Sequence, residues 1–267
     1  MSEPGELVRY GRRGPAAWLT LHRPARRNAL TPELLGELHR ALDATDADPE
    51  VRVLVITGAG NAFCAGADLT YFLGKIAAPD GCGEFVAELL EPLAHVLRRL
   101  RTSGRLTIAA VNGACFAGGL ELLVARDLVI AADSATFCDA HSRRGLTSAV
   151  GGAAGLVNAV GPVRALRMMA LSEVLTAAQL AEAGLVSEVV PIDRLSQRVT
   201  ELAAVAAERS PASILAIKQG IHRYEPQAWD EIVAEDIELF RRSWASPDMT
   251  EGVTAFLERR PPRFGPV

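Results

Sequence analysis

Glu121 is the residue whose sequence surroundings point most directly to chemistry. It lies in the segment VNGACFAGGLELLVARD of residues 111–127, three positions after Gly118, and an apolar run at residues 107–111 predicts a buried strand at the start of this segment. A strand, a small-residue turn and a helix start bring free backbone N–H groups and the positive end of a helix dipole together. Glu121 is therefore either a first-turn acid that complements the dipole, or a catalytic acid beside an oxyanion hole.

A second turn of small residues follows the clearest strand of the chain. That strand is expected at residues 51–57, which read VRVLVIT and are followed by Gly58 and Gly60. The segment NAFCAGADL comes next, and in it Ala67 precedes Asp68, which is expected to cap a helix. The order of strand and small-residue turn therefore occurs both before Asp68 and before Glu121.

The elements around these turns follow the pattern of a mixed α/β chain. Alternation at residues 16–21 predicts an early strand, and Thr31 followed by Pro32 predicts the start of a helix. A long amphipathic helix is expected over residues 84–100, after a loop at residues 74–83 that could cover a site. No internal repeat with a constant period is visible in the sequence.

The C-terminal part of the chain has a different composition. From Pro162 onward the pattern is almost entirely helical, with one short strand expected at residues 186–190. A change in composition near Pro191 predicts a boundary between a mixed region, residues 1–190, and a helical region, residues 191–267. A chain of 267 residues fits one large domain, or one domain with a helical extension.

The composition is that of a soluble globular protein, with 49% hydrophobic and 22% charged residues. The net charge of −4 argues against a general nucleic-acid partner, and no apolar run approaches the ~20 residues that span a bilayer. The N-terminal segment has no apolar core of the signal-peptide kind. We expect a cytoplasmic protein whose cysteines are reduced, with no metal site, because no CxxC spacing or paired His and acid spacing stands out. The cysteines are Cys64, Cys82, Cys115 and Cys138.

Four segments of the sequence carry a joint pattern: LHRPARRNAL (21–30), VRVLVITGAGNAFCAGADL (51–69), VNGACFAGGLELLVARDLVIAADSATF (111–137) and AEAGLVSEVV (181–190). Taken together, they resemble the crotonase superfamily, also called the enoyl-CoA hydratase/isomerase family. The tail SPDMTEGVTAFLERRPPRF (246–264) is similar to the C-terminal helix of that family. The resemblance covers nearly the whole chain and follows the order and spacing of the family.

The resemblance implies an α/β fold in which stacked ββα turns form a spiral core. In this reading the core and its acyl-CoA site occupy residues 1–190, and residues 191–267 form a helical region that mediates assembly. It implies a homotrimer, commonly paired as a dimer of trimers, and an acyl-CoA thioester as the ligand. Coenzyme A enters as part of this substrate, and no separate cofactor is expected.

The resemblance also implies roles for particular residues. Ala67 and Gly118 match the two positions whose backbone N–H groups hold the thioester oxygen in the family. Losing one such donor typically costs about 3–4 kcal/mol of transition-state stabilisation. Glu121 matches one of two glutamates that hold and activate water in the hydratases of the family.

The second glutamate of that pair is replaced here. Its position carries His141, in the run CDAHSRRGLTSAVGG, and the Pro-Gly that usually follows is replaced by Ser148 and Ala149. His141 could supply the missing acid, because an imidazolium can protonate the α-carbon. It could instead hydrogen-bond a substrate group, or be a structural histidine held by Asp139.

Contacts to the coenzyme A part are expected from three places in the chain. Arg26 and Arg27 lie in a loop that, by resemblance, is near the nucleotide, although a solvated arginine pair is the alternative. Ala65 and Asp68 belong to the turn around Ala67, where Asp68 is interpreted as a cap residue and not as a catalytic one. Phe256 and Arg259 match tail positions that reach the coenzyme A of a neighbouring subunit in the family.

Three functions remain open on the sequence alone. The first is an enoyl-CoA hydratase-like lyase, in which Glu121 activates water and His141 supplies or relays a proton. The second is other chemistry on the same stabilised enolate, such as isomerisation, decarboxylation or hydrolysis. The third is a non-catalytic acyl-CoA-binding oligomer, with Glu121 kept as a capping acid.

Overall fold

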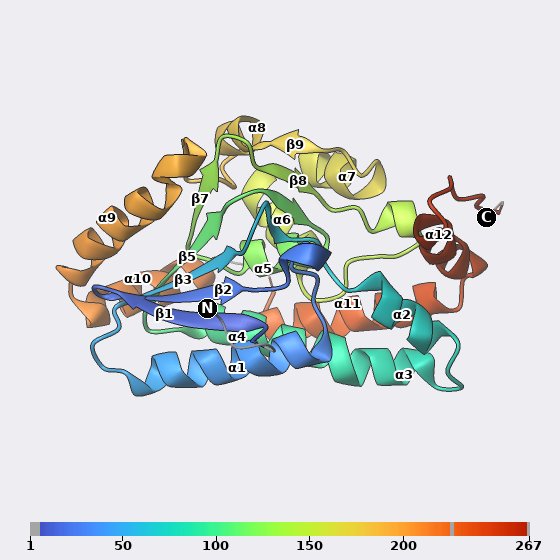
Figure 1. Ribbon diagram of the computed structural model, residues 1–267, viewed down its shortest axis with the longest axis horizontal. Helices are drawn as coiled ribbons and strands as arrows, with labels where there is room; N and C mark the ends of the chain where they lie inside the picture. Colours follow the sequence, from blue (N-terminus) through green and yellow to red (C-terminus); the bar gives the residue numbers. More distant parts are fainter. Residues whose placement is uncertain (1–5, 225–226, 266–267) are drawn as a thin grey trace.

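Two sheets stacked in successive layers carry the site (Figure 1). The computed structural model describes residues 6–224 and 227–265. The larger sheet has the strand order β1 (Val8–Arg13), β2 (Ala16–Leu21), β3 (Val53–Gly58), β5 (Leu106–Val111), β7 (Leu128–Ala132) and β10 (Glu188–Val190). The smaller sheet has the order β4 (Ala62–Cys64), β6 (Ala114–Phe116), β8 (Thr136–Cys138) and β9 (Leu175–Thr176).

The chain repeats one unit of two strands and a helical segment. The strands follow one another along the chain in twos: β3 and β4, β5 and β6, and β7 and β8. In each two, the first strand lies in the larger sheet and the second in the smaller one. Within each sheet these strands are parallel, whereas β1 pairs with β2, and β8 with β9, in antiparallel fashion. The spiral of ββα turns expected from the resemblance is therefore present.

The apolar runs of the sequence become the buried strands. Val53, Leu54, Val55 and Ile56 of β3 are all buried, as expected for a parallel strand covered on both faces. The helix predicted after Thr31 is α1 (Pro32–Ala47), and the Thr31 side chain accepts a hydrogen bond from the backbone N–H of Leu34.

The other helices follow in chain order. They are η1 (Pro24–Arg26), α2 (Leu69–Ile76), α3 (Gly81–Phe85), η2 (Val86–Leu90), α4 (Glu91–Thr102), α5 (Gly118–Val124), η3 (Ser142–Arg144), α6 (Gly152–Val160), α7 (Pro162–Ala170), α8 (Ala177–Glu182), η4 (Ile192–Arg194), α9 (Leu195–Ala207), α10 (Pro211–His222), α11 (Trp229–Trp244) and α12 (Pro247–Leu257). Within the described residues, no helix has the length and apolar character needed to cross a membrane.

The prediction of a loop at residues 74–83 is wrong for most of that segment. Helix α2 continues to Ile76 and α3 begins at Gly81, so only residues 77–80 connect them. Lys75 holds the two helices together, since its ammonium group lies 2.8 Å from a carboxylate oxygen of both Glu84 and Glu88. The glycines suggested a loop, but Gly81 is needed for packing, because a Cβ there would collide with the carbonyl of Lys75.

The long helix expected at residues 84–100 is confirmed, with one irregularity. It continues from α3 through a π-helical turn, η2, into α4. The backbone N–H of Glu91 donates to the carbonyl of Val86, five residues earlier, and Pro92 follows directly. Proline has no N–H to donate, so the irregular turn lies where the regular helical hydrogen bonds are interrupted.

The C-terminal helices fold back onto the core. Phe240 and Trp244 of α11 pack against Phe72 of α2 and Phe85 of α3, with the rings of Phe85 and Phe240 5.6 Å apart. Helix α12 lies beside α2 at the right-hand end of the molecule in Figure 1 and packs on η3. The boundary near residue 190 remains a prediction, but helices beyond it contact the core directly.

Candidate active site

The two small-residue turns singled out in the sequence lie against each other. Gly66 has a positive φ of 88°, and a Cβ on it would approach Ala117 Cβ to 2.7 Å and the backbone nitrogen of Gly118 to 3.0 Å. A glycine is therefore required where the turn before Asp68 meets the turn before Glu121. Ala67 and Gly118 both line one pocket as a result.

Backbone geometry prepares both positions. Gly118 is the first residue of α5, and the first N–H groups of a helix have no acceptor within the helix. Ala117 precedes it with an unusual backbone conformation, φ 48° and ψ −119°, that turns the chain from β6 into α5. On the other side, Ala67 forms an isolated parallel bridge with Leu30. This arrangement can offer backbone donors to an oxygen that enters between the turns.

Glu121 is 4% exposed and lies in the first turn of α5. Its Oε1 accepts two hydrogen bonds, from the Ser148 hydroxyl at 2.7 Å and from the backbone N–H of Ala149 at 3.0 Å. Its Oε2 lies on the side of Gly118, since a Cβ built on Gly118 would be 3.6 Å from it. One carboxylate oxygen is thus fixed by the protein, and the other remains beside the N–H groups of the helix start.

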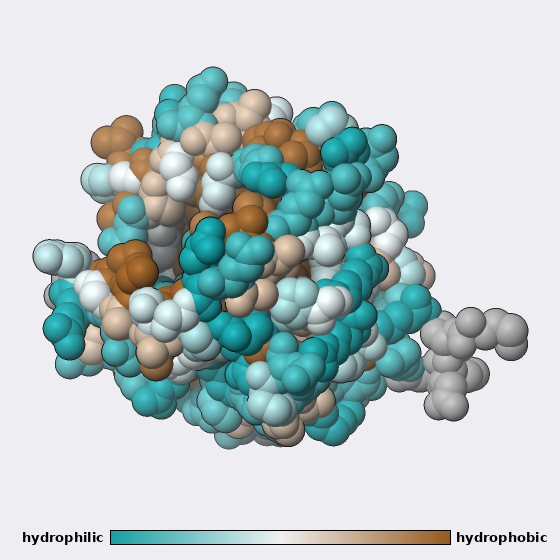
Figure 2. Space-filling model, turned by 90° about the vertical axis from the view of Figure 1, so that its left-hand side faces the viewer, coloured by the Kyte–Doolittle hydropathy of each residue, from teal (hydrophilic) through white to brown (hydrophobic). Residues whose placement is uncertain are grey.

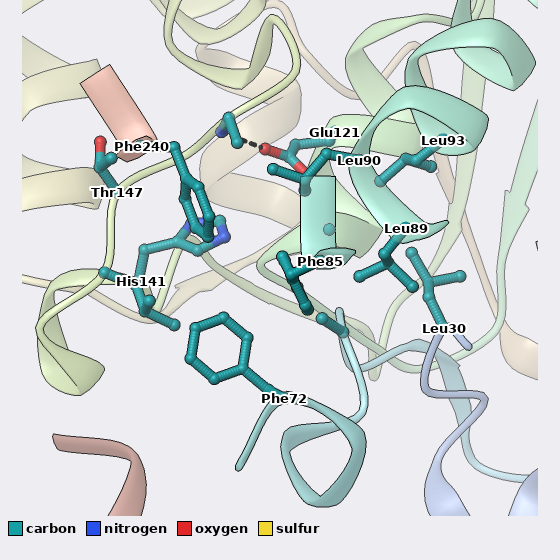
Figure 3. Close-up of a pocket in the computed structure, with 14 residues that line it drawn as sticks. Leu30, Phe72, Phe85, Leu89, Leu90, Leu93, Glu121, His141, Thr147 and Phe240 are labelled. Carbon is teal, nitrogen blue, oxygen red and sulfur yellow. Dashed lines mark hydrogen bonds between the residues drawn. The ribbon is translucent and has the colours of Figure 1, made fainter. Parts of the chain in front are cut away.

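His141 lines the same pocket from the segment after β8 (Figure 3). Its Nδ1 lies 3.0 Å from Asp139 Oδ2, and its backbone N–H donates to Asp139 Oδ1 at 3.2 Å. Burial lowers the pKa of His141, but the charge and hydrogen bond of Asp139, with a contribution from Glu121, outweigh burial and raise that pKa to about 9. The ring is therefore an imidazolium near neutral pH, and Nε2 is the nitrogen not bound to Asp139.

The rest of the pocket is apolar. The cavity volume is about 40 Å³, enough for a few water molecules. Its walls come from the Leu30 segment, from α2 to α4 and from α11, and its polar side chains are Glu121, His141 and Thr147. Figure 3 shows the apolar wall residues Leu30, Phe72, Phe85, Leu89, Leu90, Leu93 and Phe240 around the site. Across the described residues, no group of three or more His, Cys, Asp or Glu side chains is placed to hold a metal ion.

The residues expected near the coenzyme A nucleotide lie at the surface beside this pocket. Arg26 and Arg27 are exposed at η1, and the backbone N–H of Ala65 donates to the carbonyl of Arg27 at 3.0 Å. This bond places the arginine loop next to the turn that carries Ala67. Neither arginine lines the pocket of Glu121.

Asp68 caps α2, as the sequence predicted. Its Oδ1 accepts from the backbone N–H of Thr70 at 3.0 Å, and its Oδ2 accepts from the Arg23 guanidinium at 2.9 Å. Burial raises the pKa of Asp68, but these hydrogen bonds and the charge of Arg23 hold it below its usual range. No sequence pattern marked Arg23 as the partner of Asp68.

Phe256 and Arg259 lie at the end of α12, away from the pocket. Phe256 is 46% exposed, and its ring lies against the Arg144 guanidinium of η3, with 4.1 Å between the guanidinium carbon and the ring centroid. Arg259 is exposed and has a positive φ of 56°. The structure therefore groups Ala67, Gly118, Glu121 and His141 in one pocket, and leaves these two residues on the outer surface.

Three contributors to the site were not found from the sequence. Ser148 was noted only as a departure from Pro-Gly, and its bond to Glu121 depends on how the segment folds back. Phe240 and Asp236 come from α11, where Ile232, Asp236 and Phe240 form the buried face. A carboxylate at helical spacing between two apolar residues was a signal that the sequence did contain.

Comparison with known proteins agrees with this geometry. The sequence profile of the family described as enoyl-CoA hydratase/isomerase matches residues 13–266. The chain is 36% identical to a 2,3-dehydroadipyl-CoA hydratase of Escherichia coli K12, over 92% of this chain and 93% of the relative. It is 35% identical to a 1,2-epoxyphenylacetyl-CoA isomerase of the same organism, over the same shares of the two chains.

A solved structure gives the same result for the fold. An enoyl-CoA hydratase/isomerase from Xanthobacter autotrophicus Py2 superimposes with a TM-score of 0.86 at 30% identity, covering 95% of this chain and 93% of that one. Profile, relatives and fold all extend over nearly the whole length of the chain. The protein therefore belongs to the enoyl-CoA hydratase/isomerase family, the crotonase superfamily that its motifs resemble.

Proposed function

We propose that the protein adds water to the double bond of a 2-enoyl-CoA thioester, as a carbon–oxygen lyase of the hydratase type. The observation that carries this proposal is one apolar pocket in which the carboxylate of Glu121 and the imidazolium of His141 meet the turns of Ala67 and Gly118. A proton acceptor, a proton donor and two backbone donors are the groups that hydration of an enoyl thioester needs.

In this mechanism Glu121 acts as the general base. Oε2 takes a proton from water while the water oxygen bonds to the β-carbon of the substrate, and the electron pair of the double bond moves to the thioester oxygen. The backbone N–H groups of Ala67 and Gly118 stabilise the negative charge that develops on this oxygen. His141 then gives the Nε2 proton to the α-carbon, and the proton held by Glu121 restores the imidazolium before the next turnover.

The pocket favours a neutral, apolar acyl group. Its lining contains no lysine or arginine, and its one cation, His141, is already paired with Asp139. A substrate carboxylate buried among Phe72, Phe85 and Phe240 would lose its hydration without gaining a partner, which is costly. We therefore expect a short or apolar 2-enoyl-CoA to be preferred over an acyl group that ends in a carboxylate.

The remaining expectations fit the same proposal. Coenzyme A is held as part of the substrate, with Arg26, Arg27, Ala65 and Asp68 on the nucleotide side, and no separate cofactor takes part. In a cytoplasmic homotrimer or dimer of trimers, Phe256 and Arg259 contact the coenzyme A of a neighbouring subunit. Residues 1–190 then form the catalytic core, and residues 191–267 mediate assembly and supply Phe240 to the pocket.

Isomerisation of an enoyl-CoA is the second candidate. It is favoured by one relative that is named as an isomerase, whereas the replacement of the second glutamate by His141 counts against a simple isomerase. In that reaction Glu121 removes a proton from one carbon of the substrate and His141 returns a proton to another. The same oxyanion hole would stabilise the enolate between the two steps.

Kinetics of two variants test the proposal. Hydration of crotonyl-CoA and of a longer 2-enoyl-CoA is followed by loss of enone absorbance for wild type, Glu121→Gln and His141→Ala. Glu121→Gln is expected to lower kcat by about 10²- to 10⁴-fold, because it removes the general base but keeps the shape of the side chain. Binding of the thioester should stay unchanged.

Glu33→Gln is the matched control. Glu33 is also a first-turn acid, but it lies exposed at the start of α1, so its loss should not change the rate. A rate that is unchanged in Glu121→Gln would overturn the role of Glu121. If the wild-type protein hydrates neither substrate but moves the double bond of a 3-enoyl-CoA, the isomerase function would be favoured.

A further inference from the structure

Asp236 is a buried carboxyl group behind the pocket of Glu121. It lies on α11, is 8% exposed, and its Oδ2 accepts a hydrogen bond from the backbone N–H of Gly151 at 2.7 Å. Its neighbours on the buried face of the helix, Ile232 and Phe240, are apolar. A carboxylate on such a face is costly to bury, so its contact with Gly151 requires an explanation.

The segment of residues 148–151 is held by carboxylates from two helices. On one side, Glu121 of α5 accepts from the Ser148 hydroxyl and from the N–H of Ala149. On the other side, Asp236 of α11 accepts from the N–H of Gly151, two residues further on. The hydrogen bonds that fix Oε1 of Glu121 therefore come from a segment that Asp236 itself anchors.

A second contact from α11 strengthens this anchor. The Trp229 ring packs over Gly151, where a Cβ would collide with the ring, and Gly151 has a positive φ of 84°. One turn beyond Asp236 on the same helix, Phe240 lines the acyl pocket. Helix α11 thus contacts the acyl pocket and the support of Glu121 at the same time.

We propose that Asp236 is a positioning residue for Glu121, which fixes residues 148–151 so that Ser148 and Ala149 hold the Glu121 carboxylate in its reactive orientation. This proposal rests on the proposed role of Glu121 as general base. It gives α11, from the C-terminal helical region, a direct part in catalysis through the segment it anchors.

The ionisation of Asp236 affects the strength of this anchor. Burial raises the pKa of Asp236 to about 6; the N–H of Gly151 opposes this rise, and the carboxylates of Glu121 and Glu235 add to it. Asp236 is therefore negatively charged at pH 8, and a carboxylate accepts a stronger hydrogen bond from the N–H of Gly151 than a neutral acid does. The charge of Asp236 thus strengthens the anchor of residues 148–151.

Two variants separate the hydrogen bond from the charge. Asp236→Ala removes both, whereas Asp236→Asn removes the charge and keeps an oxygen that can accept from Gly151. We expect Asp236→Ala to lower kcat for crotonyl-CoA by about 10- to 100-fold with little change in KM, because a catalytic group displaced by about 1 Å can cost ~10² in rate. Asp236→Asn should retain most of kcat, because its amide oxygen can still accept a hydrogen bond from the N–H of Gly151.

Glu235→Gln is the matched control, because it removes an exposed carboxylate from the same turn of α11. It should leave both kcat and KM unchanged. Wild-type kcat in Asp236→Ala would overturn the proposal. If Asp236→Ala does not fold, the same kinetics are measured for Asp236→Val, whose side chain fills the site but accepts no hydrogen bond, and wild-type kcat in that variant would overturn the proposal.

Hydrogen exchange of the backbone amides tests the same proposal without turnover. The N–H groups of Ala149 and Gly151 should exchange faster in Asp236→Ala than in wild type, while β3 and β5 keep their protection. If wild type hydrates no enoyl-CoA, the proposed function fails, but this measurement still decides whether Asp236 anchors the segment. Unchanged exchange at both amides would overturn the anchoring role.

Discussion

At the scale of single residues, the protein prepares its two ionisable pocket groups in different ways. Glu121 has one oxygen bound by two donors from residues 148–149, which leaves the second oxygen to act. His141 has one nitrogen bound to the buried carboxylate of Asp139, which favours the protonated ring and leaves the second nitrogen to act. A structural histidine would also contact Asp139 in this way. Here the contact with Asp139 keeps the ring protonated, and so makes His141 a proton donor in the pocket.

Asp139→Asn tests the state of His141. The pKa of His141 is raised to about 9, so the ring should remain protonated, and activity that needs the imidazolium should persist, up to about that pH. Loss of the Asp139 charge removes the main cause of this rise, so the basic limb of the pH–rate profile should move to lower pH. Hydration measured between pH 6 and 10 in wild type and Asp139→Asn checks this.

The control for this prediction is Asp133→Asn. Asp133 is exposed, before β8, and its loss should leave the basic limb where wild type has it. A basic limb that does not move in Asp139→Asn would mean that His141 does not supply the proton. The limb should also vanish in His141→Ala, which retains only the slower reaction of Glu121.

The sequence located Glu121 because a local pattern marks it. The strand, the glycine turn and the helix start all lie within residues 107–121, so the chemistry could be inferred before the fold was known. Ser148 and Asp236 could not be placed in this way, because their contacts join segments 27 and 85 residues apart along the chain. Such contacts depend on tertiary packing, which no local pattern encodes.

At the scale of elements, the contact between the two small-residue turns leads to a specific prediction. Gly66→Ala would place a Cβ against Ala117 and the nitrogen of Gly118, in a backbone conformation with positive φ. The turns should move apart and displace the N–H groups of Ala67 and Gly118. Since loss of one oxyanion donor costs about 10²- to 10³-fold in kcat, a decrease of that size is expected in steady-state hydration.

Gly74→Ala is the matched control, within α2. A Cβ there meets nothing within 4 Å, and the helix should gain about 0.5–1 kcal/mol from alanine. Activity should be unchanged and the urea midpoint of unfolding should rise. If Gly66→Ala kept wild-type kcat and folded normally, the close contact of the turns would not be needed for catalysis.

Helix α11 is expected to limit the length of the acyl chain. Phe240 closes the pocket together with Phe72 and Phe85, so Phe240→Leu should open space without adding a polar group. The ratio of kcat/KM for octenoyl-CoA to that for crotonyl-CoA should rise. Each further methylene that gains contact is worth about 10-fold or more in such a pocket.

Leu239→Ala is the control on the same helix, because Leu239 is exposed and does not line the pocket. An unchanged chain-length ratio in Phe240→Leu would mean that the acyl group does not extend toward α11. Dehydroadipyl-CoA, which ends in a carboxylate, should remain a poor substrate of both variants. Preference for it over crotonyl-CoA would contradict a neutral acyl pocket.

The regular elements could be predicted from the sequence where one local signal dominated. The apolar run of β3 and the Thr31-Pro32 start of α1 are of this kind. The segment at residues 74–83 was predicted as a loop because glycine is usually a breaker, whereas here Gly81 allows close packing. The repeated ββα turns could not be detected as a repeat in the sequence, because the helices of the turns differ in length and no constant period results.

At the scale of the whole molecule, apolar surface remains uncovered. Figure 2 shows hydrophobic areas in the left and upper parts of one face. On α10, Ile217 and Ile221 are 61% and 62% exposed and lie one helical turn apart, and the buried residue of that helix is Lys218, which pairs with Asp127. A helix whose isoleucines are exposed while its lysine is buried is typical of an interface between subunits.

The last prediction concerns assembly through α10. Each isoleucine buried between subunits contributes about 1.5–3 kcal/mol, so replacing Ile217 and Ile221 by Glu should dissociate the oligomer. Light scattering after size exclusion should give three or six chain masses for wild type and one for the double variant. Val205→Glu, which places the same charge at an exposed site on α9, should have the same mass as wild type.

The assembly prediction also has a kinetic consequence. If Phe256 and Arg259 complete the coenzyme A site of a neighbour, the dissociated variant should have a raised KM while Glu121 and His141 stay in place. An unchanged mass in the double variant would exclude α10 from the interface, and a wild type of one chain mass would overturn the predicted trimer.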